Sequence, residues 1–166
     1  MALTDAEHRR LIDQYAEGPE RLRAAIESLP EEARKWRPAE GKWSAHEIVC
    51  HCGDAETVAA ARLRFLLCER SPVIQAWDQD TWARELRYHD LPLGPSLEAV
   101  RAVRAHTANL LRTLSAADWA RTGRHSESGE WDVDRWLSIY AEHVHKHAGQ
   151  IDRNLAAWRQ RGSPSS

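Results

Sequence analysis

The sequence lacks several features that would set it apart from an ordinary globular protein. Its 166 residues contain three Cys, which cannot all pair within one chain, so we expect reduced thiols. No apolar run approaches the roughly 20 residues needed to cross a bilayer. The N-terminal segment MALTDAEHRR is too polar for a signal peptide. We therefore expect a cytoplasmic protein with no membrane partner.

An excess of charge of one sign is also absent. Lys and Arg number 23 against 25 Asp and Glu, which gives a formal net charge of -2. A nearly balanced total provides no electrostatic basis for binding nucleic acid, so we expect no such partner. The chain also has no Gly-rich phosphate loop and no Gly-x-Ser-x-Gly motif. These absences direct attention to the histidines.

Strand signals are almost absent, whereas helical periodicity extends along most of the chain. The sequence predicts an all-α fold, a four-helix bundle with a long crossover between the second and third helices. We expect the four long helices at about residues 4–29, 44–69, 97–114 and 132–159. A short helix is expected at about 77–86 inside the crossover, and a polar loop at 115–131. Residues 1–160 should form one domain, and 161–166 a flexible C-terminal tail.

Two helix starts carry a capping box, in which a hydroxyl and a Glu three residues later bond to each other's backbone N–H groups. Thr4 with Glu7 predicts the first start, and Ser44 with Glu47 predicts the second. The dipeptide at 18–19, Gly-Pro, predicts a kink or a break within the first helix.

The last predicted helix carries the residues that indicate chemistry. Tyr140, His143, His147 and Ile151 recur in steps of three and four, so they lie on one face that must point into the bundle. Two imidazoles one turn apart can bind one metal ion. The alternative is that each histidine makes a single hydrogen bond in the core. Two neutral imidazoles on one buried stripe would each leave a ring nitrogen that needs a partner, and this favours a shared cation.

His51 is the natural third ligand, because it lies on an inward-facing line of the second helix with Ile48 and Ala55. Three histidines leave part of the coordination sphere open, as in catalytic sites. His106, at the edge of the third helix's apolar face, is a candidate fourth ligand or acid/base group. Cys52 is expected to be a core residue or an accessory ligand. Glu47 and Asp54 are candidate carboxylates that orient an imidazole. His145 should lie on the solvent face.

Two segments of the sequence resemble a known family. Residues 43–51 read WSAHEIVCH and follow Arg37-Pro38 and Gly41-Lys42; residues 143–151 read HVHKHAGQI and follow Trp136-Leu137. In order and spacing these segments resemble the two motifs of the DinB-like (damage-inducible, YfiT-like) superfamily. The resemblance covers about residues 5–160.

The resemblance implies a four-helix bundle in an up-up-down-down arrangement, frequent homodimers, and a divalent metal ion, zinc or nickel, bound by three histidines. His51, His143 and His147 match the ligand positions. Characterised relatives include bacillithiol and mycothiol S-transferases and a mycothiol-dependent isomerase. We therefore expect a metal-dependent enzyme that transfers a low-molecular-weight thiol to an electrophilic small molecule or performs metal-assisted hydrolysis. The alternatives are a non-enzymatic metal-binding stress-response protein and a bundle that has lost its metal. The catalytic residues are not assigned.

Overall fold

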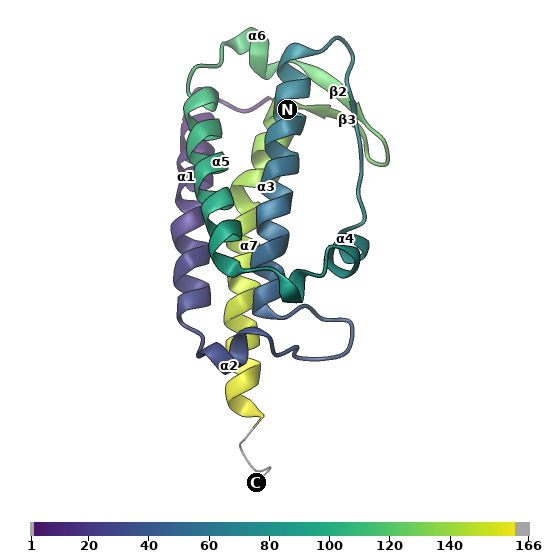
Figure 1. The fold of residues 1–166 in the computed structure, drawn as a ribbon. Coiled ribbons are helices and arrows are strands. Elements are labelled where there is room, and N and C mark those ends of the chain that lie inside the picture. The colour runs from purple at the N-terminus through teal and green to yellow at the C-terminus, as the bar shows by residue number, and fades with distance from the viewer. Residues whose placement is uncertain (1, 162–166) are drawn as a thin grey trace.

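The structure is a computed structural model that describes residues 2–161 (Figure 1). Four long helices form its main body: α1 (Asp5–Glu27), α3 (Ala45–Cys68), α5 (Leu93–Leu111) and α7 (Val133–Gln160). The connections contain the short helices α2 (Glu31–Arg34), α4 (Gln79–Glu85) and α6 (Ala116–Trp119), and the 3-10 helix η1 (Tyr88–Asp90). They also contain the strands β1 (Val73–Ile74), β2 (Thr122–His125) and β3 (Gly129–Asp132). The predicted four-helix bundle is confirmed.

Side-chain caps fix where two of the long helices begin. Both predicted capping boxes are present, with Thr4 and Glu7 at the start of α1 and Ser44 and Glu47 at the start of α3. Helix α5 begins earlier than the predicted residue 97, because Gly94 and Pro95 lie in its first turn. Proline is tolerated there, since the N–H groups of a first turn have no partner within the helix.

The long crossover between α3 and α5 sets the direction of the helices. In Figure 1, α1 and α7 run downward, whereas α3 and α5 both run upward. Ion pairs agree with these directions: Arg23 with Glu98 and Arg112 with Asp13 join opposite ends of α1 and α5. The crossover returns the chain to the lower end before α5 begins, so the predicted crossover is confirmed. The up-up-down-down order that the resemblance implies is wrong, because α3 and α5 are parallel.

A small sheet lies at the upper end of the bundle, where the sequence predicted a polar loop. Strands β2 and β3 form an antiparallel hairpin, and β1 from the crossover pairs in parallel with β2. Gly129 begins β3 with a positive φ of 79°, a conformation that favours glycine. The strands have at most four residues each, too few for an alternating hydrophobic pattern to indicate them.

Two of the three apolar clusters of the described residues lie along the bundle, with a polar layer between them. The upper cluster includes Leu63 and Trp136, and the lower cluster includes Ile48 and Ile151. Glu56 of α3 and Arg104 of α5 lie between the clusters with no exposed surface. A polar layer inside a bundle is costly unless its groups are paired, so these residues need an explanation.

Helix α1 passes through this level without the predicted break. Pro19 lies inside the helix, and its missing N–H leaves the carbonyl oxygen of Tyr15 without a helical donor. Arg104 supplies that donor from α5, with Nη1 2.7 Å from the oxygen. The helix therefore continues because a side chain from another helix replaces the lost hydrogen bond.

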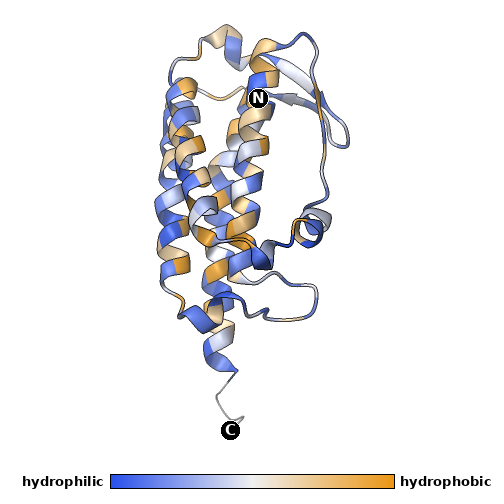
Figure 2. Ribbon diagram, viewed as in Figure 1, coloured by the Kyte–Doolittle hydropathy of each residue, from blue (hydrophilic) through white to orange (hydrophobic). Residues whose placement is uncertain are grey.

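Hydrophilic and hydrophobic residues are interleaved along every long helix (Figure 2). Within residues 2–161, no helix has both the length and the apolar character required to cross a membrane. Of the predicted C-terminal tail, Arg161 caps α7 and residues 162–166 lie outside the described residues. The single domain over residues 1–160 stays a prediction.

Candidate metal centre

Three histidines converge between α3 and α7. His51 comes from α3, and His143 and His147 come from successive turns of α7. One ring nitrogen of each lies within 4.8 Å of the others. The ring centroids are 4.7 Å apart for His51 and His147, and 4.6 Å apart for His143 and His147. The structure thus brings together the residues that the sequence selected, and their role as metal ligands stays a prediction.

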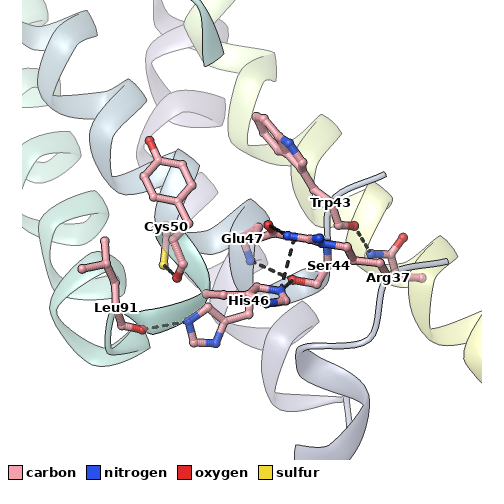
Figure 3. Close-up of polar contacts among 10 residues, drawn as sticks. Arg37, Trp43, Ser44, His46, Glu47, Cys50 and Leu91 are labelled. Atoms are coloured by element: carbon pink, nitrogen blue, oxygen red, sulfur yellow. Dashed lines mark hydrogen bonds and ion pairs between the residues drawn. The ribbon is translucent and has the colours of Figure 1, made fainter. Parts of the chain in front are cut away.

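The N-terminus of α3 is held by a set of polar contacts (Figure 3). The Ser44 hydroxyl caps the helix, Arg37 donates two hydrogen bonds to the Glu47 carboxylate, and His46 donates one to the carbonyl oxygen of Leu91 at 2.7 Å. Asn154 of α7 donates to the carbonyl oxygen of Trp43 at 3.0 Å. Of these contacts, the bond from Asn154 joins the segment just before α3 to α7, the helix that carries the other two histidines.

Burial keeps two of the imidazoles neutral. Burial, with added repulsion from His147 and His143, lowers the pKa of His51 to about 2. Burial, with added repulsion from His143, lowers the pKa of His147 to about 4, although Gln150 and Glu56 act in the opposite direction. Both side chains are therefore neutral at pH 7, and a neutral imidazole has the lone pair that a metal ion needs.

The nitrogen atoms of the cluster fit a divalent cation. Among residues 2–161, neither ring nitrogen of His51 has a hydrogen-bond partner, nor does Nδ1 of His143. His147 donates from Nδ1 to the side-chain oxygen of Gln150 at 3.1 Å, which leaves Nε2 as its ligand atom. Imidazole nitrogens suit zinc and nickel, and three of them leave a coordination position open.

Two tryptophans pack against His51, and a third packs against one of them. The ring centroid of His51 lies 4.8 Å from that of Trp43 and 5.6 Å from that of Trp77, which is nearly parallel to it. Trp82 packs against Trp77 at 4.3 Å. Two surface cavities of about 540 Å³ each adjoin these indoles, one lined by Trp43 and the other by Trp77. A molecule that approaches the histidines would therefore meet aromatic surface.

Three of the other candidates lie away from the cluster. Glu47 caps α3 and binds Arg37, and Asp54 accepts a hydrogen bond from the Tyr88 hydroxyl at 2.6 Å. Neither orients His51, whose nitrogens both lack partners within the described chain, so this prediction is wrong. His106 is exposed on α5 and does not belong to the cluster, so it is not placed to be a fourth ligand.

Two further predictions concern neighbours of the ligands. Cys52 is fully buried in the lower apolar cluster, as predicted for a core residue. Burial raises the pKa of its thiol. His145 is only half-buried and donates to the carbonyl oxygen of Gln14 on α1 at 2.8 Å, so the predicted solvent-facing position is wrong. Helix α7 turns this side chain towards α1 rather than into water.

Glu56, which was not among the predicted residues, lies beside the cluster. One of its carboxylate oxygens is 3.8 Å from Nδ1 of His143 and 2.7 Å from Nη2 of Arg104. Burial acts to raise the pKa of Glu56, but Arg104 and the hydrogen bonds outweigh it, so the pKa lies below its usual value. The sequence did contain a signal for this pair: Glu56 and Arg104 are charged residues on the inward faces of α3 and α5, where charged side chains are rare.

The fold and the cluster define a class: a four-helix bundle with three convergent histidines from its second and fourth long helices. The family model of the DinB superfamily matches residues 14–151. The chain belongs to the DinB superfamily.

Two relatives match most of this chain in sequence. A protein of Oceanobacillus iheyensis named "Putative metal-dependent hydrolase" is 31% identical over 140 residues, 84% of this chain and 81% of the relative. A protein of Geobacillus kaustophilus with the same description is 30% identical over 134 residues, 80% of this chain and 75% of the relative.

Among solved structures, YfiT from Bacillus subtilis matches with a TM-score of 0.89 at 21% identity, over 95% of this chain and 91% of YfiT. Its description is a "probable metal-dependent hydrolase with an unusual four-helix bundle topology". This likeness supports the fold, including the parallel α3 and α5.

Proposed function

We propose that the protein is a metal-dependent enzyme in which His51, His143 and His147 bind a divalent cation, zinc or nickel. The observation that carries this proposal is the approach of three imidazole nitrogens within 4.8 Å, one from buried His51 and two from half-buried His143 and His147. A cation bound there would act as a Lewis acid and lower the pKa of a water or thiol at its open position. His51 and His147 hold their ligand nitrogens ready without first losing a proton, because burial keeps both side chains neutral.

The nucleophile comes from outside the chain. Cys50 and Cys52 flank His51 in sequence, but both are buried, and burial raises the pKa of each thiol. A buried thiol with a raised pKa stays protonated and is a poor nucleophile. We therefore propose that a low-molecular-weight thiol is transferred to an electrophilic small molecule, with Trp43 and Trp77 offering apolar surface to that molecule.

Hydrolysis is the second candidate, in which water replaces the thiol as the nucleophile. The names of the relatives support it, since the Oceanobacillus and Geobacillus proteins are both described as metal-dependent hydrolases. The same three histidines and the same open position would serve either nucleophile.

The first experiment measures bound metal. Protein purified without a His tag and dialysed against zinc or nickel should hold about one ion per chain, as three imidazoles at one point predict. Substoichiometric metal after this treatment would contradict the proposal and favour a bundle that has lost its metal.

The second experiment separates the candidate activities. The metal-loaded protein is given a panel of small thiols with a chlorodinitroarene, and separately a panel of activated esters. Thiol-dependent loss of the arene supports thiol transfer, and ester cleavage without thiol supports hydrolysis. If the protein binds metal but accelerates neither the thiol reaction nor ester cleavage above the uncatalysed rate, the result would favour a non-enzymatic metal-binding stress-response protein.

We further propose that the protein acts as a homodimer in the cytoplasm. Phe65 of α3 and Val73 of β1 support a subunit interface, because their apolar side chains are 49% and 66% exposed. Light scattering of the purified protein measures the mass, and the mass of a single chain would contradict the dimer.

A further inference from the structure

Four helices meet in one buried polar network beside the candidate metal centre. Glu56 and Arg104 have no exposed surface, and Arg104 donates to Glu56 over 2.7 Å. The Tyr15 hydroxyl donates to the second Glu56 oxygen at 3.1 Å. Arg104 also donates to the carbonyl oxygens of Tyr15 and Tyr140, both at 2.7 Å. The network thus connects α1, α3, α5 and α7 at the level of His143.

Stability alone does not account for this network. Replacing a buried ion pair by apolar residues of similar size is often neutral or stabilising, because both charges lose their hydration. Two residues of α1 also make room for the network and leave an acceptor free for it. A Cβ atom at Gly18 would overlap Nη1 of Arg104 and lie 3.1 Å from its Cζ, and Pro19 leaves the Tyr15 carbonyl available to Arg104.

The network places a carboxylate against a candidate ligand. Oε1 of Glu56 lies 3.8 Å from Nδ1 of His143, and that nitrogen is buried and has no other partner among residues 2–161. The separation exceeds hydrogen-bond distance, so the imidazole has to move towards the carboxylate for the bond to form. A histidine that binds a metal through one nitrogen usually donates the other N–H to a carboxylate, carbonyl or water.

We propose that Glu56 is a positioning residue for His143: it accepts the Nδ1–H of the imidazole, so that Nε2 is presented to the cation, and Arg104 with Tyr15 holds the carboxylate in place. This inference rests on the proposed function for the role of the cation, but the choice of tautomer does not require one. His147 follows the same arrangement, with Nδ1 donating to Gln150. Both α7 imidazoles therefore direct Nε2 to one point.

The chain offers a matched control on the same helix. Glu47 is also a buried α3 carboxylate paired with an arginine, Arg37, and it lies one turn before His51. Its bonds go to the cap of α3, and it has no hydrogen bond to the histidine cluster. Removing this pair, in which Glu47 is buried and Arg37 is exposed, tests the loss of an α3 carboxylate and its arginine without changing the environment of His143.

The first test uses metal-free protein and reads the tautomer of His143 by nitrogen-15 NMR of its ring. The wild type should hold the Nδ1–H form. The double variant E56L/R104M removes both charges together, so it leaves no unpaired buried charge, and circular dichroism checks that it folds. In this variant the preference for Nδ1–H should be lost, whereas R37M/E47Q should keep it. An unchanged tautomer in E56L/R104M, or an Nε2–H form in the wild type, would overturn the proposal.

The second test titrates each protein with Co²⁺ and follows its visible absorption. E56L/R104M should bind Co²⁺ about 10–100-fold more weakly than the wild type, the usual effect of losing a partner of a metal-bound histidine. R37M/E47Q should bind as the wild type does. Equal affinity in E56L/R104M and the wild type contradicts the role of Glu56. Failure of the wild type to bind contradicts the proposed function instead, and the tautomer measurement then decides on Glu56.

Discussion

At the scale of single residues, the candidate centre depends on which ring nitrogen each histidine turns to the others. Gln150 occupies Nδ1 of His147, and Glu56 lies opposite Nδ1 of His143. Helical spacing brings these two rings to one face, but only their neighbours select the nitrogen that remains. His51 completes the cluster from α3, where burial removes it from water.

We expect His147→Ala to abolish stoichiometric metal binding, because two imidazoles remain where three converge. Elemental analysis of the dialysed variant measures the loss. His145→Ala is the matched control, since His145 lies on the same helix and bonds to Gln14 of α1 instead. A His147→Ala protein with a full complement of metal would show that the ligands are assigned wrongly.

The depressed pKa values of His51 and His147 predict a stability that falls in acid for the metal-free protein. The unfolded histidines take up protons near pH 6.5, whereas folded His147 does so at about 4 and folded His51 at about 2. Between pH 6.5 and 4 the unfolded state binds more protons. The free energy of unfolding should therefore decrease as the pH falls, by up to about 1.4 kcal/mol per pH unit for each histidine.

Denaturant unfolding between pH 6.5 and 4.5, with a chelator present, measures this slope. His147→Asn should reduce the slope by up to about 1.4 kcal/mol per pH unit, because one of the two buried imidazoles is removed and the unfolded state then takes up one proton fewer. Identical slopes in the variant and the wild type would mean that His147 is not held neutral by the fold.

At the scale of elements, α1 shows how a local rule is overridden by a contact from another helix. Gly18 and Pro19 each weaken an isolated helix, and together they predict a kink or a break. In the bundle, Arg104 occupies the space left by the missing side chain of Gly18 and bonds to the Tyr15 carbonyl. No pattern within α1 contains that information, because the donor comes from α5.

Gly18→Ala should destabilise the protein, although alanine is the better helix former by about 1 kcal/mol. The new Cβ would displace an arginine that is held by Glu56 and two carbonyl oxygens, so we expect a net loss of about 1–3 kcal/mol. Urea denaturation monitored by circular dichroism measures it. Gly149→Ala is the control: its Cβ would lie 3.6 Å from Arg153, an ordinary contact, and it should be neutral or stabilising.

The helices and the sheet differ in how far the sequence predicts them. The starts of α1 and α3 were predicted to within a residue, because a capping box acts between residues three apart. The hairpin of β2 and β3 was missed, since its strands are short and β2 also pairs with β1, about 50 residues earlier in the chain. Pairing at that separation depends on where the crossover lies.

At the scale of the whole molecule, the histidine cluster links α3 to α7, which come from the two halves of the chain. A cation bound by the folded state alone would stabilise that state by mass action. At a metal concentration of 100 times the Kd, the free energy of unfolding should rise by about 2.7 kcal/mol.

Thermal unfolding with and without zinc or nickel measures this stabilisation. His147→Ala should show no such shift, while His145→Ala should behave as the wild type does. An equal rise in Tm for wild type and His147→Ala would place the stabilising ion elsewhere on the molecule.

The sequence by itself determined the four helices and the choice of His51, His143 and His147, because helical periodicity and caps act over a few residues and set which side chains share a face. The tertiary structure decided the partners of those side chains. Glu56 and Arg104 are 48 residues apart, and Trp77 reaches His51 from a crossover without regular helical periodicity. Such contacts depend on how the crossover returns the chain, and no local pattern records that path.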